Sequence, residues 1–408
     1  MRCRHCAAEL SLRFLDLGGA PPSNAYLSRE QLHAPETWFP LCLLVCTRCW
    51  LVQTADYAGR EALFTDDYAY FSSVSTSWLA HAERYVEAMI GRFRLGKDSM
   101  VVEIAANDGY LLQYVRQRDI PTYGVEPTLS TAAAARAKGI EIVSEFFGVA
   151  LADSLVAAGR SADLIAANNV LAHVPDINDF VAGFAHLLKP SGVATFEFPH
   201  LMRMVQQAQF DTAYHEHYSY LSLSAVARIF AHNGLQVFDV AELPTHGGSL
   251  RVFAQRADTG RYPVCPSVVT LLATEEAAGM NTPAFYSRFQ QVAEGVKDGL
   301  LSFLLEARRE GKSVAAYGAA AKGNTLLNFA GVKSDLLAFV CDAAPSKQGK
   351  FLPGSHIPIL TPDAIAQRKP DYVVILPWNL ADEVKTQLSF ISDWGGRFVV
   401  AVPSLRIN

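Results

Sequence analysis

The sequence predicts an α/β protein in which two Rossmann-like parallel-sheet units follow a small cysteine-rich N-terminal unit. Three observations lead to this prediction. Five of the seven cysteines lie in the first 60 residues, which show no regular hydrophobic period. From about residue 98, short apolar runs alternate with helical segments, and the same alternation starts again near residue 313. Such alternation is typical of parallel sheets with crossover helices.

The expected elements follow in order along the chain. Residues 1–60 are expected to be irregular, and residues 76–95 to form a helix, because their apolar side chains recur at helical spacing. Residues 235–256 predict two strands around a Gly-Gly turn, and residues 268–310 predict helices. Strands are expected at the apolar runs 100–104, 120–125, 163–167, 192–198, 313–318, 337–341, 372–376 and 397–402.

Composition narrows the class of protein. Of the 408 residues, 50% are hydrophobic and 18% are charged, so the chain can bury more than one core and is not disordered. The formal net charge of −5 argues against a nucleic-acid partner. The N-terminus lacks the apolar core of a signal peptide, and we expect no segment that spans a membrane. A cytoplasmic location with reduced thiols is therefore expected.

Two Cys-x-x-Cys pairs predict a zinc site. Cys3 and Cys6 form the first pair, and Cys46 and Cys49 the second. Two such turns can close a tetrahedron of thiolates around one ion, which leaves no open position for chemistry. Four unrelated buried thiols or a redox dithiol are the alternatives. The redox interpretation is disfavoured because neither pair opens a helix after a strand.

The stretch that ends in Asn107-Asp108-Gly109 predicts a loop that binds a nucleoside cofactor. An apolar strand carrying Glu103 runs into small and acidic residues before a helix, and the next strand ends in Glu126-Pro127. A carboxylate there can accept the hydroxyl protons of a ribose. The loop lacks the Gly-x-Gly-x-x-Gly pattern of nicotinamide enzymes, so S-adenosylmethionine, which has a ribose but no pyrophosphate, fits better. Alternatively, the two glutamates only end strands at the solvent.

A dense polar cluster follows the fifth strand of this unit. Residues 214–221 hold three Tyr, two His and one Glu. A histidine titrates near neutrality and suits a base that removes a proton from carbon, and Glu216 could orient it. A surface helix, or metal ligation by His215 and His217, would explain the same residues.

The second α/β unit opens with a turn rich in small residues. Tyr317-Gly318-Ala319-Ala320-Ala321-Lys322 follows an apolar run and leads into a helical segment. Amides at the start of the helix, together with Lys322, could hold a diphosphate. A plain strand-to-helix turn would have the same sequence.

Together these residues resemble the bacterial C-methyltransferases that act on thymidine-diphosphate keto-deoxysugars. The resemblance runs nearly the whole length of the chain. Besides both cysteine pairs, it includes Phe14–Gly18, Pro22-Ser23-Asn24, Asp67–Ser73, Val102–Ile104, Asn107–Gly109, Gly124–Pro127, His173-Val174-Pro175, Tyr214-x-Glu216-His217, His246-Gly247-Gly248, Tyr317–Lys322, Asp342-x-x-Pro345-x-Lys347 and Pro377-Trp378-Asn379.

The resemblance implies four parts of an α/β chain. These are a zinc-binding domain at 1–62, a class I methyltransferase core at 63–260, a helical connection at 261–310, and a second Rossmann-like domain at 311–408 that helps to bind the sugar nucleotide. It implies S-adenosylmethionine-dependent methylation of the carbon beside the ketone of a nucleotide-linked 4-keto-deoxysugar, with structural zinc. We expect a monomer or a weak homodimer.

The resemblance also assigns residues. His217 is the first choice for the base, with Tyr214 as relay or alternative and Glu216 orienting, while Tyr70 or His173 would stabilise the negative charge on the keto oxygen. The cofactor is expected to contact Glu103, Ala105, Asn107, Asp108, Gly109, Glu126, Pro127, Phe146 and Asn168. The sugar nucleotide is expected to contact Tyr68, His246, Tyr317, Lys322, Asn324, Asp342, Lys347, Trp378 and Asn379.

The sequence departs from the family pattern at a few pocket positions, and three other functions stay open. Ala105 stands where several relatives have glycine, and Phe71 replaces a histidine of at least one branch, which leaves the exact sugar undecided. The other functions are an O- or N-methyltransferase on a similar sugar, a nicotinamide-dependent sugar-nucleotide oxidoreductase, and a non-catalytic zinc-dependent binding protein.

Overall fold

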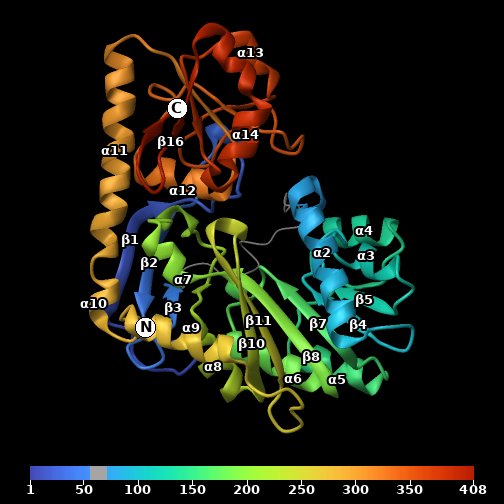
Figure 1. Ribbon diagram of the computed structural model, residues 1–408. Coiled ribbons are helices and arrows are strands. Elements are labelled where there is room, and N and C mark those ends of the chain that lie inside the picture. The colour runs from blue at the N-terminus through green and yellow to red at the C-terminus, as the bar shows by residue number, and fades with distance from the viewer. Residues whose placement is uncertain (56–70) are drawn as a thin grey trace.

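The computed structural model describes residues 1–55 and 71–408, which form three sheets and the helices that cover them. Figure 1 shows the three units that result. An N-terminal unit holds the first sheet, a central unit holds the largest sheet, and a C-terminal unit holds the third. The predicted α/β fold class is confirmed.

The N-terminal unit contains an antiparallel four-stranded sheet in the order β1-β2-β3-β9, so the expectation of an irregular segment was wrong. Its last strand comes from far along the chain, because Val52 pairs with Tyr220 and Gln53 with Ser219. The polar cluster at 214–220 is thereby fixed to the N-terminal unit. The strands are β1 (Leu12–Ala20), β2 (Phe39–Val45), β3 (Val52–Thr54) and β9 (Ser219–Tyr220).

The central unit is built on a seven-stranded sheet in the order β10-β11-β8-β7-β4-β5-β6. The strands from β4 to β8 are parallel, and the hairpin of β10 and β11 adds an antiparallel edge. The strand order reverses between β4 and β7, and ligands of such sheets bind beyond the carboxyl ends of the strands at that point. The strands are β4 (Val101–Ile104), β5 (Thr122–Val125), β6 (Ile142–Val143), β7 (Ala162–Asn168), β8 (Leu188–Pro199), β10 (Leu235–Leu243) and β11 (Ser249–Arg256).

Helices cover both faces of the central sheet. On one face, α2, α3 and α4 share a core with alternate strand residues such as Val101, and on the other face α5, α6 and α8 share a core with the intervening residues such as Val102. The helix α2 begins where Ser75 Oγ accepts from Trp78 N at 3.2 Å. The helices are α2 (Thr76–Phe93), α3 (Leu112–Arg116), α4 (Leu129–Ala137), α5 (Val149–Ala157), α6 (Ile177–Leu187), α7 (Leu201–Gln206) and α8 (Leu223–His232).

Three helices lead from the central unit to the C-terminal unit. They are α9 (Pro266–Ala277), α10 (Pro283–Tyr286) and α11 (Phe289–Arg309). The long helix α11 lies beside β1 and continues to the C-terminal unit (Figure 1). Its buried face, which includes Phe289, Val296 and Leu300, belongs to a core that also contains Phe14 of β1 and Val314 of β12. One apolar core therefore joins the N-terminal and C-terminal units.

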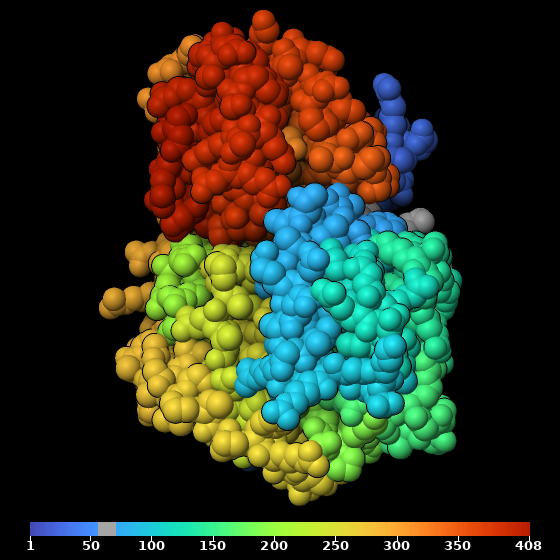
Figure 2. Space-filling view, turned by 45° about the vertical axis from the view of Figure 1, so that its right-hand side comes forward, coloured from blue at the N-terminus to red at the C-terminus, as the bar shows by residue number. Residues whose placement is uncertain are grey.

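The C-terminal unit has a six-stranded sheet in the order β14-β13-β12-β15-β16-β17, which is parallel except at β17. Figure 2 shows this unit against the central unit, with α2 in light blue reaching the border between them. The elements are β12 (Val314–Tyr317), α12 (Ala321–Phe329), β13 (Val340–Cys341), β14 (Ile359–Leu360), α13 (Asp363–Arg368), β15 (Tyr372–Ile375), α14 (Ala381–Gln387), β16 (Arg397–Val400) and β17 (Arg406–Ile407).

Short 3-10 helices carry many of the polar groups described below. Those at residues 171–173, 245–247 and 378–380 follow β7, β10 and β15 directly, and such loops after strands often carry functional side chains. The 3-10 helices are η1 (Gln31–His33), η2 (Ser72–Val74), η3 (Leu171–His173), η4 (Phe210–Thr212), η5 (Thr245–Gly247), η6 (Trp378–Leu380) and η7 (Ser389–Trp394).

Candidate active site

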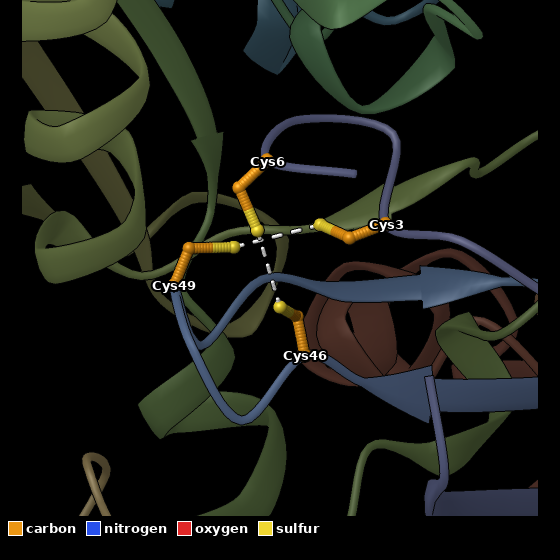
Figure 3. Close-up of side chains that lie close together, drawn as sticks. All are labelled: Cys3, Cys6, Cys46 and Cys49. Carbon is orange, nitrogen blue, oxygen red and sulfur yellow. Dashed lines mark hydrogen bonds between the residues drawn. The ribbon is translucent and has the colours of Figure 1, made fainter. Parts of the chain in front are cut away.

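The four cysteines predicted as zinc ligands converge. Figure 3 shows Cys3 and Cys6 facing Cys46 and Cys49, and the four sulfur atoms all lie within 4.8 Å of one another. Zn–S bonds of about 2.3 Å in a tetrahedron place the sulfurs roughly 3.8 Å apart, so the cluster has the size of the ion. The Gln53 side-chain amide donates to Cys3 Sγ at 3.3 Å. Four thiolates close the coordination sphere, so this is a structural site.

The loop after β4 has the tight backbone that a close-lying nucleoside needs. Ala105, Asn107 and Gly109 have φ values of 59°, 49° and 76°, all in the left-handed region. A Cβ at position 109 would lie 2.4 Å from Ile140 Cδ1, so this position also needs glycine for space. The chain therefore bends back at the carboxyl end of β4, beside the point where the strand order reverses.

Buried acceptors surround this loop. Glu103 is fully buried, and the Tyr110 hydroxyl is its polar neighbour and also approaches Asn168. Asp108 Oδ1 is buried without a hydrogen-bond partner among the described residues. Burial raises the pKa of Glu103 well above its usual range. Glu126 accepts from Asn107 N at 2.9 Å, which ties β5 to the loop. Buried acceptors without partners are costly, so the site favours a ligand rich in N–H and O–H groups.

Two predicted cofactor residues also hold the chain that covers the loop. Asn107 Oδ1 accepts from Ser72 N at 2.9 Å, and the Asp108 carboxylate accepts from Ser73 N at 3.3 Å. Lys138 Nζ donates to Ser73 Oγ and to the Asp108 carbonyl, both at 2.7 Å. The segment before α2 is therefore docked onto the cofactor loop.

The remaining residues assigned to this area differ in exposure. Pro127 is half-buried in the turn before α4, and Phe146 is 45% exposed. Tyr68 and Tyr70, which were assigned to the sugar nucleotide and to catalysis, lie outside the described residues.

Tyr214 and His217 form a hydrogen-bonded pair. His217 Nδ1 lies 3.0 Å from the Thr212 carbonyl oxygen, which can only accept, so the ring proton is on Nδ1. Burial, with a smaller effect of His173, lowers the pKa of His217 well below its usual range, which keeps the ring neutral. Its Nε2 is therefore an acceptor, and the Tyr214 hydroxyl donates to it at 2.7 Å. The hydroxyl oxygen and the imidazole are arranged to pass a proton between them.

Glu216 does not orient His217, which corrects the sequence prediction. Its Oε1 accepts from the Asn24 side-chain amide at 3.1 Å, and its backbone carbonyl accepts from His173 Nδ1 at 2.8 Å. The Thr212 carbonyl takes the orienting role, because adjacent residues of this turn point in different directions. Burial raises the pKa of Glu216 and lowers that of His173 to about 4.

A cluster from the C-terminal unit meets the central unit at Asp211. The Trp378 indole N–H donates to Asp211 Oδ2 at 2.7 Å, and Asp211 is fully buried. Lys322 Nζ lies 4.4 Å above the Trp378 ring and donates to Asn379 Oδ1 at 2.7 Å. Burial raises the pKa of Asp211 to about 6, against the effect of the Lys322 ammonium. Three of the predicted substrate residues, Lys322, Trp378 and Asn379, are thus brought together.

The other predicted substrate residues of this unit support its first turn. Asp342 accepts from Ala319 N at 2.7 Å, and Lys347 Nζ donates to the Ala319 carbonyl at 2.9 Å. Asn324 is buried and donates to a backbone carbonyl of the N-terminal unit at 2.6 Å. Tyr317 donates to a side chain of α14 at 3.4 Å. Asp342 and Lys347 therefore fix the turn, a contribution that the motif alone did not indicate.

His246 lies at the centre of these groups. Its Nε2 is 3.1 Å from Asn169 Nδ2, one residue beyond the β7 position that carries Asn168. Trp78 of α2 lies against its ring, with centroids 5.2 Å apart. The His246 imidazole also contributes to lowering the pKa of His217, after burial and His173. The cofactor side and the Tyr214–His217 pair thus meet at the end of β7.

Comparison with known proteins decides the family. Three family models match the chain: a zinc binding domain over residues 3–64, a methyltransferase domain over 78–240, and a C-methyltransferase C-terminal domain over 244–403. The C-methyltransferase NovU of Streptomyces niveus is 34% identical over 405 residues, which cover 99% of this chain and 96% of NovU. The chain belongs to the C-methyltransferase family.

Among solved structures, the chain is similar to two methyltransferases of low identity. An S-adenosylmethionine-dependent methyltransferase of Clostridium acetobutylicum shows 11% identity and a TM-score of 0.35, over 44% of this chain and 92% of that one. Magnesium protoporphyrin IX methyltransferase of Synechocystis shows 15% identity and a TM-score of 0.33, over 44% and 81%.

The site of this C-methyltransferase fits its cofactor. S-adenosylmethionine carries an ammonium group and two ribose hydroxyls, and the buried oxygens of Glu103 and Asn168 and the carboxylate of Glu126 are acceptors for such donors. The protein is an S-adenosylmethionine-dependent enzyme with a structural zinc site. Within the described residues, no helix is long and apolar enough to cross a membrane.

Sequence reasoning missed four polar residues of the site, namely Asn24, Asn169, Glu197 and Asp211. Asn24 lies in one of the motifs that carry the family resemblance, and Asn169 directly follows Asn168 at the end of a predicted strand. The sequence could therefore have indicated both Asn24 and Asn169 as site residues. Glu197 and Asp211 had no local signal, because each acts through residues far away in the chain.

Proposed function

We propose that the enzyme methylates the carbon next to the ketone of a nucleotide-linked 4-keto-deoxysugar, most specifically one carried by thymidine diphosphate. The observation that carries this proposal is the Tyr214–His217 pair, which stands beside the cofactor strand ends and opposite a cationic residue of the C-terminal unit. A ketone makes the neighbouring C–H acidic, and a neutral histidine backed by a phenol is suited to remove that proton.

The proton transfer follows from the hydrogen bonds. The Thr212 carbonyl keeps the His217 proton on Nδ1, so Nε2 receives any further proton. As the C–H bond breaks, its proton passes to His217, either directly or through the Tyr214 oxygen while the tyrosine proton moves to Nε2. The electron pair of the C–H bond moves into the enolate. Bound S-adenosylmethionine supplies the electrophilic methyl group, and Glu103, Glu126 and Asn168 position it.

The C-terminal unit supplies groups for the nucleotide. We assign Lys322 to the diphosphate, because, after burial, its ammonium group also lowers the pKa of His246 and of His217 and therefore acts on this site. Trp378 presents a flat ring beside it, and Asn379 orients the ammonium group.

Two measurements test the proposal. The purified enzyme, S-adenosylmethionine and a panel of nucleotide keto-sugars are incubated, and mass spectrometry looks for a gain of one methyl group. In deuterated water without the cofactor, the hydrogen beside the ketone should exchange. Methylation on oxygen or nitrogen, with no exchange at carbon, would contradict the proposed chemistry, and methylation of sugars that lack the nucleotide would contradict the substrate class.

A further inference from the structure

The loop between β10 and β11 has an unusual backbone next to the catalytic pair. His246, Gly247 and Gly248 have φ values of 55°, 84° and 115°, and Asn169 on the facing loop has a φ of 53°. Glycine adopts such values freely, but a histidine does so at a cost of about 1–2 kcal/mol. Strained residues of this kind persist only where their surroundings hold them, and they gather at functional sites.

Glu197 at the end of β8 holds both loops in place. Its backbone carbonyl accepts from Asn169 N at 2.7 Å, and its Oε1 accepts from Thr245 Oγ1 at 3.0 Å. Its Oε2 is bonded by Arg251 at 2.9 Å and by His81 at 3.0 Å. Glu197 is fully buried, so these bonds fix the approach of the two strained residues to one another.

The contact between Asn169 and His246 fixes the tautomer of the histidine. In the orientation that the structure gives the Asn169 amide, Nδ2 lies 3.1 Å from His246 Nε2 and donates to it, and this orientation places the ring proton on Nδ1. Burial, and then the nearby Lys322 ammonium, lower the pKa of His246 to about 4. The ring is therefore neutral at physiological pH and keeps a single N–H donor.

Of the two residues that the sequence assigned to this task, Tyr70 lies outside the described residues, and His173 is less suited. His173 was expected to stabilise the keto oxygen, but its Nδ1 is 2.8 Å from the Glu216 carbonyl oxygen, which can only accept. Because burial lowers the pKa of His173 to about 4, its neutral ring has one N–H, and that N–H is directed at the carbonyl. His173 therefore presents no second N–H to a substrate.

We propose that the Nδ1–H of His246 donates a hydrogen bond to the keto oxygen of the sugar, and that Asn169 is the positioning residue that keeps the proton on Nδ1. The inference rests on the proposed function. As the C–H bond breaks and its proton passes to the Tyr214–His217 pair, the electron pair moves onto the keto oxygen, and the hydrogen bond strengthens with that charge. A neutral imidazole polarises a carbonyl without surrendering its proton.

The sharpest test changes the tautomer. In Asn169→Asp the carboxylate accepts from Nε2–H, which moves the ring proton away from Nδ1. In Asn169→Gly the side chain is lost, but glycine adopts the left-handed backbone conformation of this position without strain. Asn169→Gly should therefore fold even if Asn169→Asp does not. Nitrogen NMR of the histidine-labelled enzyme, with His246→Phe to assign the signal, reports which ring nitrogen carries the proton.

We expect the His246 ring proton to lie on Nδ1 in the wild-type enzyme and on Nε2 in Asn169→Asp. The kcat of Asn169→Asp should fall about 10²–10³-fold, which is the usual loss when one oxyanion donor is removed, with little change in KM or in cofactor affinity. His246→Gln, which keeps an N–H, should retain more activity than His246→Phe. A wild-type proton on Nε2, or an undiminished kcat in both Asn169 variants, would overturn the inference.

Failure of the proposed function would look different. The NMR measurement needs no substrate, so it reports on the Asn169–His246 contact even if no nucleotide keto-sugar is methylated. In that case His246 would have the expected tautomer, but the wild-type enzyme would show no turnover with these sugars. The proposed role of His246 at the keto oxygen would then be rejected together with the proposed function. A wrong tautomer in an enzyme that does methylate keto-sugars would remove only the inference about His246.

Discussion

Removal of the Tyr214 hydroxyl tests the catalytic pair with the least structural change. In Tyr214→Phe the ring stays, so its contact with the His217 imidazole, with centroids 3.9 Å apart, is kept. The variant loses the 2.7 Å hydrogen bond and leaves His217 Nε2 buried without that donor. Such a loss costs about 1–3 kcal/mol of stability, against a typical total of roughly 5–15. The variant should therefore fold.

The expected loss of activity is larger than the loss of stability. A positioned base contributes about 10²–10⁴-fold, and His217→Asn should lose that factor while its affinity for S-adenosylmethionine stays near wild type. If the proton passes through the Tyr214 oxygen, Tyr214→Phe should lose as much, and the double variant should be little worse than either single one, because the two residues act as a unit. If His217 acts directly, the tyrosine variant should lose much less.

Proton exchange in deuterated water isolates this step from methyl transfer. The wild-type enzyme and the three variants are compared for deuterium uptake beside the ketone, with cofactor affinity measured by calorimetry. Tyr123→Phe is the matched control, because its hydroxyl bonds the Arg160 carbonyl at 2.9 Å on a different part of the central unit. A His217→Asn variant that exchanges at the normal rate would place the base elsewhere. Since the pKa of His217 is lowered, the exchange rate should also show no fall near pH 6.5.

Three further outcomes are expected. Cys46→Ser/Cys49→Ser should contain less than one zinc per chain by metal analysis and should fold poorly, because a structural site contributes to folding; undiminished zinc would contradict the site. Glu126→Ala should weaken S-adenosylmethionine binding in calorimetry by roughly 1.5–3 kcal/mol, and unchanged affinity would remove Glu126 from the site. Glu275→Ala should lower the free energy of unfolding in urea by roughly 3–5 kcal/mol, since it breaks a buried pair with His200. Burial opposes ionisation of Glu275, but the His200 and Ser224 hydrogen bonds lower its pKa, so its contribution is present above about pH 4.3 and is lost as the pH falls through the lowered value.

The sequence was a good guide to the sheets whose strands are uniformly buried. The apolar runs around Val101, Tyr123 and Ile165 became β4, β5 and β7, because parallel strands covered on both faces read as continuous hydrophobic stretches. The strands of the N-terminal unit were missed. In β1 the pairing with β2 shifts between Arg13 and Leu15 and again between Asp16 and Gly19, so the alternation that would reveal a strand is interrupted.

The candidate site was predictable where a motif carries its own geometry. Paired cysteines bring four sulfurs together, and a strand that runs into Asn107-Asp108-Gly109 makes a binding loop. Contacts between segments that are distant in the chain have no sequence motif that would predict them. Trp378 reaches Asp211 across 167 residues, a contact that depends on how the C-terminal and central units pack, and Thr245 reaches Glu197 across 48 residues between strands of one sheet.

The orientation of His217 shows why a nearby carboxylate is a weak guide to catalytic roles. Glu216 precedes it in the chain, yet its side chain extends to Asn24 of the N-terminal unit. A backbone carbonyl, that of Thr212, fixes the imidazole instead. Carbonyl directions depend on the path of the chain and leave no mark in residue identity. Because this acceptor is uncharged, an imidazolium formed in the proposed proton removal would gain no neighbouring negative charge from it, so return of the proton would be favoured. In the proposed mechanism the enolate therefore needs stabilisation at its oxygen, which is where the proposed hydrogen bond from His246 would act.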